Sequence, residues 1–390
     1  MEALKILLLN HNVAFSGGAT FYRALQLARG FARGGHSATL MASSPRNVWD
    51  FQEQIIDKVR LIISPGILPT RWRYGFDPYE ILRRIRRVRG AQYDIVHAFD
   101  NRPTVLYPAL ACQKKGSRLV MDWCDWFGRG GAVEERTNPF LRIPLRYLDT
   151  YFEEAFRLHA DATTVINSAL EERALELGVP REKIMRLPNG ADVEHIQVLE
   201  KGNARAKLNL PKGTPILGYE GSLFASDADL LLEAFAQVRK SYPEALLILI
   251  GNPKVELPPQ PDIIRTGFLP TPELNLYLCA CDVLCLPLTD TQANRGRWPS
   301  KLGDYFAAGR PVAACGVGDV PSTIQETGAG LFSQPLPDDF ATKILHLLAD
   351  PGLQAQLGTN ARQAAESQYN WASLTGQVAA LYNRLLGESM

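Results

Sequence analysis

Three basic residues and one carboxylate lie within ten positions of one another in the second half of the chain. Arg295, Arg297 and Lys301 surround a Pro-Ser pair that predicts a helix start, and Asp304 follows Lys301 by one turn. Exposed N–H groups at a helix start bind anions, and neighbouring cations add to this. The combination predicts a site for a diphosphate, with the carboxylate beside sugar or ribose hydroxyls. A solvated basic loop on an ordinary strand–helix unit is the alternative.

Polar side chains also follow predicted strands in the first half. His97 lies on the strand 94–99 and Asp100 follows it, while Asp122 and Asp125 follow the next strand. In open α/β sheets, ligands bind beyond the carboxyl ends of the strands. We therefore take Asp122 and Asp125 as catalytic candidates, and His97 and Asp100 as candidates on the acceptor side. Each aspartate could instead cap a helix or pair with an arginine.

A glycine pair, Gly17 and Gly18, separates the first predicted strand, 4–10, from a helix over 20–33. Glycines let backbone N–H groups approach an anion closely, so this layout is typical of a phosphate cradle. It is not the G-x-G-x-x-G dinucleotide pattern, and no acidic residue follows a suitable second strand. A nicotinamide-dependent dehydrogenase is therefore disfavoured.

The elements that must position these residues alternate between strand and helix twice along the chain, with a turn at 188–192 between the two series. This alternation predicts an α/β protein with two doubly wound parallel-sheet domains and a cleft between them. We place the domains at 1–190 and 191–370, with a terminal amphipathic helix in 371–390.

Composition sets further limits. The 390 residues are 46% hydrophobic and 21% charged, which suits two apolar cores. No apolar run is long enough for a membrane span, and the N-terminus predicts a buried strand rather than a signal peptide. The six cysteines lack paired C-x-x-C spacing, so we expect reduced core thiols in a cytoplasmic protein and no metal site.

Charge is uneven along the chain. Residues 1–186 hold 27 Lys and Arg against 20 Asp and Glu, whereas the remainder is acidic. The acidic second half disfavours nucleic acid. Two arginine clusters suggest contact with an anionic membrane, and hence a protein peripheral to the inner face of the cell membrane; the alternative is a solvated helix face. They comprise Arg71 and Arg73, then Arg83, Arg84, Arg86, Arg87 and Arg89.

In order and spacing, several segments resemble the family 4 retaining glycosyltransferases of the GT-B type, over nearly the whole chain. The resemblance implies two Rossmann-like domains and a terminal helix that crosses back onto the first. It also implies metal-independent transfer of a sugar from a nucleotide-sugar to a hydroxyl acceptor, as in polysaccharide biosynthesis. The segments are Gly17-Gly18, Asp94–His97, Asp122–Asp125, Pro188–Asp192, Gly218–Leu223 followed by Leu230–Phe235, and Ser300–Val312.

If the chain is an active transferase of this kind, site roles follow. Arg295, Arg297 and Lys301 would hold the diphosphate, Asp304 would bind the ribose, and Asp122 or Asp125 would orient sugar or acceptor. Because the leaving phosphate is thought to take the acceptor's proton, neither aspartate need be a nucleophile. The remaining donor contacts would come from Gly17, Gly18, Ser222, Gly267 and Phe268.

The chain departs from the family pattern at several of these positions. Gly296 replaces the first of two glutamates, and Ser222 and Asp227 lie where the family has an arginine and a lysine. The family's histidine falls near Cys124, and its later glutamate is replaced around Ser322. Either the basic residues have been relocated to Arg295, Arg297 and Lys301, which we favour, or the protein is an inactive sugar-nucleotide-binding scaffold subunit.

Overall fold

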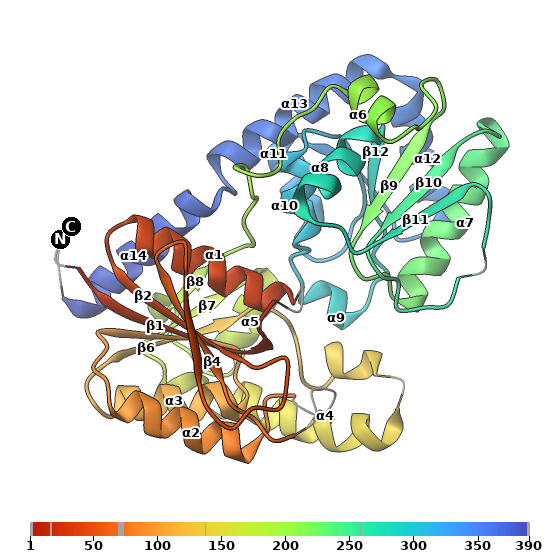
Figure 1. The fold of residues 1–390 in the computed structure, drawn as a ribbon. Coiled ribbons are helices and arrows are strands. Elements are labelled where there is room, and N and C mark those ends of the chain that lie inside the picture. Colours follow the sequence, from red (N-terminus) through yellow and green to blue (C-terminus); the bar gives the residue numbers. More distant parts are fainter. Residues whose placement is uncertain (1–2, 16–17, 69–73, 137, 258, 388–390) are drawn as a thin grey trace. The chain divides into compact units, whose positions relative to one another are not determined.

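The computed structural model describes residues 3–15, 18–68, 74–136, 138–257 and 259–387. The chain divides into two compact units (Figure 1). Unit 1 comprises Met1–Pro188 together with Trp371–Met390, and unit 2 comprises Asn189–Asn370. The terminal helix therefore belongs to the first unit, although unit 2 separates it from the rest of that unit in sequence.

Unit 1 is built on an eight-stranded sheet in the order β3-β4-β2-β1-β5-β6-β7-β8. Every pairing is parallel except that of β3 with β4. The strands are β1 (Lys5–Val13), β2 (Ser37–Ser43), β3 (Gln52–Ile56), β4 (Val59–Ser64), β5 (Ile95–Phe99), β6 (Arg118–Trp123), β7 (Ala162–Val165) and β8 (Ile184–Arg186).

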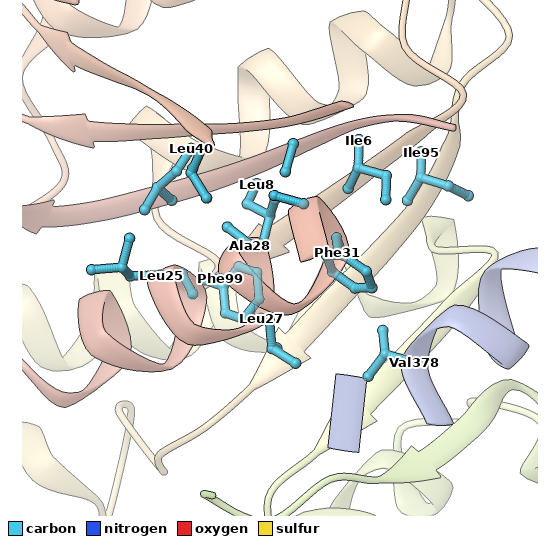
Figure 2. Close-up of a cluster of buried hydrophobic side chains, with 14 of the residues drawn as sticks. Ile6, Leu8, Leu25, Leu27, Ala28, Phe31, Leu40, Ile95, Phe99 and Val378 are labelled. Atoms are coloured by element: carbon cyan, nitrogen blue, oxygen red, sulfur yellow. The ribbon is translucent and has the colours of Figure 1, made fainter. Parts of the chain in front are cut away.

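Helices cover both faces of this sheet, which explains why the central strands read as continuous apolar runs. Ile6 and Leu8 of β1 pack on one face against α1 and α14, in the cluster that Figure 2 shows. Leu7 and Leu9 pack on the other face with α2, α3 and α4. The helices are α1 (Ala19–Arg33), α2 (Pro78–Arg89), α3 (Pro103–Gln113), α4 (Pro139–Glu154), α5 (Ser168–Glu176) and α14 (Trp371–Leu386), with short 3₁₀ turns at Ala132–Glu135, Arg157–His159 and Arg181–Lys183.

Gly30 allows α1 and α14 to pack closely. A Cβ atom at Gly30 would lie 2.3 Å from Thr375 Oγ1, so only glycine fits at this crossing. Farther along α14, the buried Tyr382 ring stacks on Phe31, with 5.1 Å between ring centroids. The terminal helix is thus part of the core of unit 1.

Unit 2 has a six-stranded, wholly parallel sheet in the order β11-β10-β9-β12-β13-β14. Its strands are β9 (Ile216–Glu220), β10 (Leu246–Ile250), β11 (Ile263–Gly267), β12 (Val283–Leu286), β13 (Val312–Cys315) and β14 (Gly330–Ser333). Its helices are α6 (Lys201–Lys207), α7 (Ala225–Ser241), α8 (Thr271–Ala280), α9 (Gln292–Arg295), α10 (Lys301–Ala307), α11 (Val320–Thr327), α12 (Pro337–Ala349) and α13 (Pro351–Ser367).

The structure differs from the sequence-based expectation in local detail. The antiparallel β3 was not expected, because its largely exposed residues lack an apolar pattern. Part of the presumed basic loop before Lys301 forms the short helix α9, whose N-cap Thr291 accepts a hydrogen bond from Asn294 N.

Candidate active site

The carboxyl ends of the parallel strands of unit 2 meet at one edge of the sheet. Tyr305 of α10 ties two of them together: its hydroxyl accepts a hydrogen bond from Glu220 N at the end of β9 (2.9 Å) and donates one to Cys285 O in β12 (3.1 Å). The following residue, Gly221, has φ +103° and receives support from β10, because its N–H donates to Ile250 O. The loop after β9 is therefore fixed at both sides.

Lys301, the first residue of α10, lies against this loop. Its Nζ donates a hydrogen bond to Tyr219 Oη over 3.0 Å and lies 4.6 Å from the centre of the Tyr219 ring. A Cβ at Gly221 would lie 3.2 Å from Lys301 Cε. An ammonium has three donors, and the bond to Tyr219 uses one. Two N–H donors remain for a ligand at the end of β9.

Arg297 approaches the start of the next helix. Its guanidinium carbon lies 5.4 Å from the centre of the Phe224 ring, and Phe224 is the N-cap residue of α7. In the part of the chain that the structure describes, no side chain caps the first turn of this 17-residue helix. The positive end of its dipole and its uncapped N–H groups therefore favour an anion here, next to a guanidinium.

Two carboxylates accompany the cations. Glu220 and Asp304 are half-buried, and Glu220 Oε2 is buried without a hydrogen-bond partner among the described residues. Burial raises the pKa of Asp304, and so do the neighbouring charges of Glu220 and Asp192. Burial also raises the pKa of Glu220, while the Lys301 ammonium acts in the opposite direction. The carboxyl groups of Glu220 and Asp304 can thus accept hydrogen bonds from the hydroxyls of a ligand. The cations beside them suit its phosphates.

The residue at the family's lysine position has a structural role. Asp227, in the first turn of α7, is buried, and its Oδ1 accepts hydrogen bonds from the backbone N (2.9 Å) and hydroxyl (2.8 Å) of Thr289. Asn294 Nδ2 donates to the same oxygen over 3.3 Å and to Thr289 O over 2.9 Å. Asn294 Oδ1 in turn accepts from Arg297 Nη1 at 3.1 Å. Asp227 therefore holds the segment that presents Arg297.

The other expected donor residues lie at loops around this edge. Ser222 is exposed, and its carbonyl accepts a hydrogen bond from Tyr219 Oη at 2.7 Å. Gly267 ends β11 with φ +69°, and its carbonyl accepts from Gly251 N. The Phe268 side chain that follows is 75% exposed. An exposed ring beside main-chain groups is suited to contact with a base.

Arg295 requires a correction. Its Nε and Nη2 bind the two carboxylate oxygens of Asp290 at 2.6 and 2.7 Å, on the surface. This bidentate pair turns the guanidinium to Asp290, whereas Arg297 and Lys301 approach the loop after β9. We therefore remove Arg295 from the group that would hold a diphosphate.

In unit 1, Gly18 is the N-cap residue of α1, and Gly17 lies outside the described residues. A Cβ at Gly18 would lie 2.7 Å from Asn12 Nδ2, so the chain passes close to the end of β1. Among the described residues no side chain caps α1, and the first turn of the helix has no acidic residue. These features agree with an anion-accepting backbone.

Asp122 is fully buried, and its place contradicts direct contact with a substrate. Its oxygens accept hydrogen bonds from Arg23 Nε and Nη2 (3.0 and 2.9 Å) and from Thr164 Oγ1 (2.6 Å). His97 is buried in the same network, with Nδ1 2.7 Å from Tyr382 Oη, and burial lowers its pKa to about 4. We assign both residues to the core of unit 1.

Asp100 also belongs to a buried network. Its Oδ2 lies 2.7 Å from His11 Nδ1 and 3.6 Å from Arg102 Nη1, and Arg102 Nε donates to Asp149 at 3.1 Å. Burial alone would raise the pKa of Asp100, but His11 and Arg102 lower it. Its φ of +100° is a costly conformation of the kind that functional sites retain. Because the carboxylate is enclosed, we assign it to fixing the end of β5 rather than to acceptor contact.

Asp125 lies half-buried in the loop after β6, and Glu153 of α4 holds that loop. Glu153 Oε1 accepts hydrogen bonds from Trp123 Nε1 (2.8 Å) and Phe127 N (2.9 Å), and Oε2 accepts from Gly128 N (2.8 Å). Burial raises the pKa of Glu153 to about 6. Of the two catalytic candidates, Asp122 and Asp125, only Asp125 is therefore kept, because it lies on a loop that Glu153 holds in place.

The five arginines of α2 differ in burial and pairing, so they do not form one solvated face. Arg84 is fully buried against Glu80, so it cannot meet a membrane. Arg83 and Arg87 pair with acidic residues beside the sheet edge, whereas Arg86 and Arg89 are exposed. Arg71 and Arg73 lie outside the described residues.

In the described part of the chain, no group of three or more His, Cys, Asp or Glu residues could hold a metal ion. The six cysteines are free thiols, and five of them are buried. No described helix is both long and apolar enough to cross a membrane.

Two family models match the chain: the glycosyl transferase 4-like domain over residues 17–190, and the glycosyl transferases group 1 over residues 214–350. Together they span most of both units. The chain is a glycosyltransferase of the GT-B fold. Its relatives are distant. The MMP α-(1→4)-mannosyltransferase of Mycolicibacterium hassiacum is 23% identical, with 98% of each chain covered.

A D-inositol 3-phosphate glycosyltransferase of Nocardia farcinica is 27% identical, but the alignment covers 57% of this chain and 53% of that protein. Solved structures share the fold of this glycosyltransferase. Sucrose-phosphate synthase from Thermosynechococcus elongatus has a TM-score of 0.76 at 20% identity, with 98% of this chain and 99% of that chain covered. Anabaena HepE, in complex with UDP and glucose, has a TM-score of 0.71 at 15% identity, with 98% and 100% covered.

No sequence pattern pointed to Tyr219 and Glu220 at the carboxyl edge of the unit 2 sheet, or to His11, Arg23 and Glu153 in unit 1. Glu220 could have been found, because it ends a predicted strand just as Asp100 follows one. The partners in unit 1 are far apart in sequence, as with Arg23 and Asp122, so no local pattern joins them.

Proposed function

We propose that this glycosyltransferase moves a sugar from a nucleotide-diphosphate sugar to a hydroxyl acceptor, with retention of anomeric configuration and without a metal. The observation that carries the proposal is the convergence of Lys301 and Arg297 on the loop between β9 and α7. The family pattern has its two cations on that loop, where this chain has Ser222 and Asp227. Cations from another segment thus occupy the region from which the usual pair is missing.

The diphosphate would take hydrogen bonds from Lys301, Arg297 and the uncapped N–H groups of α7. Asp304 would accept hydrogen bonds from the ribose hydroxyls. Gly267 and Phe268 would contact the base, and Ser222 offers an additional hydroxyl. The N–H groups at the start of α1, beginning with Gly18, would offer further hydrogen bonds to the donor phosphates or the sugar.

We further propose that Glu220 replaces the first glutamate of the family pattern. The family's first glutamate falls on Gly296 here, yet Glu220 at the end of β9 is close enough to Asp304 for its charge to raise the pKa of Asp304, and the Lys301 ammonium acts to lower the pKa of Glu220. The family pattern has cations on the β9 loop and carboxylates on the α10 segment. In this chain the cations Arg297 and Lys301 lie on the α10 segment, and one carboxylate, Glu220, lies at the end of β9. We assign Glu220 to accepting hydrogen bonds from donor hydroxyls, since its buried Oε2 has no hydrogen-bond partner among the described residues.

In the transfer step, the bond from the anomeric carbon to the diphosphate oxygen breaks and a bond to the acceptor oxygen forms on the same face. The acceptor's proton passes to the leaving phosphate. Lys301 and Arg297 would stabilise the negative charge that develops on the diphosphate, a role that fixed cations and helix N–H groups perform without reorganisation. Asp125 would orient the sugar or the acceptor hydroxyl rather than form a covalent bond.

For the acceptor, we propose a glycan or lipid-linked hydroxyl at the cytoplasmic side of a membrane. One relative, 24% identical over 47% of this chain, is a GDP-mannose-dependent mannosyltransferase of Corynebacterium glutamicum named for a monoacylated phosphatidylinositol monomannoside. The basic first half of the chain agrees with an anionic membrane surface nearby.

A thermal-shift screen with UDP-, GDP- and ADP-sugars, followed by assays of donor hydrolysis and transfer, tests the function. A donor at 100 times its Kd stabilises the folded state by about 2.7 kcal/mol. Stabilisation with slow hydrolysis of the same donor supports an active transferase. Stabilisation without turnover on any acceptor would favour the inactive scaffold, and no stabilisation by any nucleotide-sugar would reject the donor site.

A further inference from the structure

Helix α4 exposes an unusual face. Phe140, Ile143, Tyr147 and Tyr151 recur at helical spacing and are 87%, 59%, 66% and 57% exposed. Leu148, also on the outer side, is 42% exposed. With a rise of about 1.5 Å per residue, the stripe from Phe140 to Tyr151 is roughly 16 Å long. We call these five residues the α4 stripe.

The stripe is not a general property of unit 1. Among the large hydrophobic residues that are exposed in the described chain, α1, α5 and α14 contribute none. Helices α2 and α3, which cover the same sheet face as α4, add Leu82 and Tyr107. Figure 1 shows α2, α3 and α4 together below the sheet of unit 1. Among the helices of unit 1, the exposed large hydrophobic side chains are therefore concentrated on α2, α3 and α4. The others of the unit lie on loops, on β3 and on a short 3₁₀ turn: Phe15, Trp49, Ile55, Ile67 and Leu158.

Two of these helices, α2 and α4, also present positive charge, whereas α3 has no charged residue. Arg86 and Arg89 are exposed on α2. At the side of the α4 stripe, Arg142 is half-buried, and Arg146 is exposed but paired with Glu134 at 3.0 Å. Nearly all of their acidic residues are turned inward: Glu80, Asp149 and Glu153 are buried. The exception, Glu154, is paired with Arg173. Outward-facing residues on these helices are thus mainly aromatic, aliphatic or basic.

We propose that this face of unit 1 docks onto an anionic lipid bilayer, with the α4 stripe in the interfacial region and the arginines among the headgroups. Aromatic residues are favoured at the boundary between headgroups and acyl chains, and interfacial helices combine such a face with flanking basic residues. Each cation near an anionic surface strengthens the attraction to it. A second copy of the chain fits less well, because a two-fold contact would bring the arginines of one copy against those of the other.

The proposal does not depend on the donor site, since its test does not read activity. The full chain is floated with phosphatidylcholine vesicles, with and without one third phosphatidylglycerol. We expect the protein to float with the anionic vesicles, less so at high salt, and to stay behind with phosphatidylcholine alone. Absence from the anionic vesicles, or equal binding to both kinds, overturns the proposal.

Variants locate the surface. Phe140→Ser with Tyr147→Ser should lower the partition coefficient by at least about tenfold, because two interfacial side chains are lost. Arg86→Ser with Arg89→Ser should lower it by a similar factor at low salt. The matched control is Leu336→Ser with Phe332→Ser, exposed apolar residues of unit 2, which should bind like the unaltered chain.

Thermal unfolding checks that each variant is folded, and Ile143→Ser alone serves as a milder second test of the stripe. If the stripe variants bind vesicles as the unaltered chain does, the α4 stripe is not the docking element and the proposal fails. A dimer in solution that the stripe variants dissociate, together with unchanged vesicle binding, would identify a second copy as the occupant instead.

Discussion

Lys301 Nζ donates a hydrogen bond to Tyr219 Oη across 3.0 Å, and so joins the start of α10 to the end of β9. The bond places the ammonium beside the loop in which the family pattern has its own cations. Burial raises the pKa of Tyr219, while the lysine beside it acts in the opposite direction. The Tyr219 phenol thus remains neutral. It orients the Lys301 ammonium without neutralising it, so that the positive charge is available to a ligand.

Lys301→Ala should weaken nucleotide binding by at least about 1.5 kcal/mol, or roughly tenfold, because a charge-assisted hydrogen bond to phosphate is lost. Calorimetry with the nucleotide that most stabilises the unaltered protein measures this. Lys240→Ala, at the far end of α7, is the control and should leave affinity unchanged. Equal affinity in both variants would count against the donor site.

Asp304→Asn should raise the Tm at neutral pH, since it removes a carboxylate that burial, Glu220 and Asp192 all disfavour in its charged form. A raised pKa means that the folded state binds the proton more tightly than the unfolded state. The unaltered protein therefore loses stability as pH rises from the unfolded pKa of about 4 through the higher folded value.

Thermal scans at several pH values test the sign. The difference in Tm between Asp304→Asn and the unaltered chain should be near zero at low pH and grow as pH rises. The exposed Asp229→Asn on α7 is the comparison. A difference that shrinks with rising pH would show that Asp304 is stabilised, not destabilised, as a carboxylate.

Arg23→Ala should destabilise unit 1 by about 3–5 kcal/mol, because it leaves the Asp122 carboxylate buried without its cation. The same guanidinium also holds Leu187 O and Pro188 O, at 2.7 and 2.8 Å. Chemical denaturation measures the loss. Arg29→Ala, which breaks the more exposed pair with Asp57, should cost about 0–1 kcal/mol. Similar losses in the two variants would refute the buried pair as a main support of the strand ends.

Gly303→Ala should lower both stability and nucleotide affinity. A Cβ at Gly303 would lie 2.7 Å from Gly190 O and 3.2 Å from Ala191 Cα, so backbone atoms must move. Such overpacking costs about 1–3 kcal/mol and would displace the helix that carries Lys301 and Asp304. Gly213→Ala, with no atom within 4 Å, is the control. Normal Tm and affinity in Gly303→Ala would mean that α10 can shift without consequence.

The sequence predicted the two α/β sheets well because strands buried on both faces are continuous apolar runs, as at 4–10 and 245–250. It also drew attention to Lys301, Arg297 and Asp304, whose spacing on one segment is local. It could not separate Asp122 from Asp125, since the partner that buries Asp122 is Arg23, 99 positions away. Nor could the sequence show that Arg295 pairs with Asp290 while Arg297 lies against Phe224, because the direction of each side chain depends on the helical turn of α9.

The helix α14 has a consequence for how the protein is made. Unit 2 is a continuous stretch of chain, whereas unit 1 needs Val378, Leu381 and Tyr382 to cover α1 and to supply the neighbour of His97. During synthesis from the N-terminus, unit 2 can therefore be complete while the apolar side of α1 is still uncovered. A fragment ending at residue 188 would expose that surface, so we expect it to aggregate, and recombinant work on unit 1 should join the terminal helix to it by a linker.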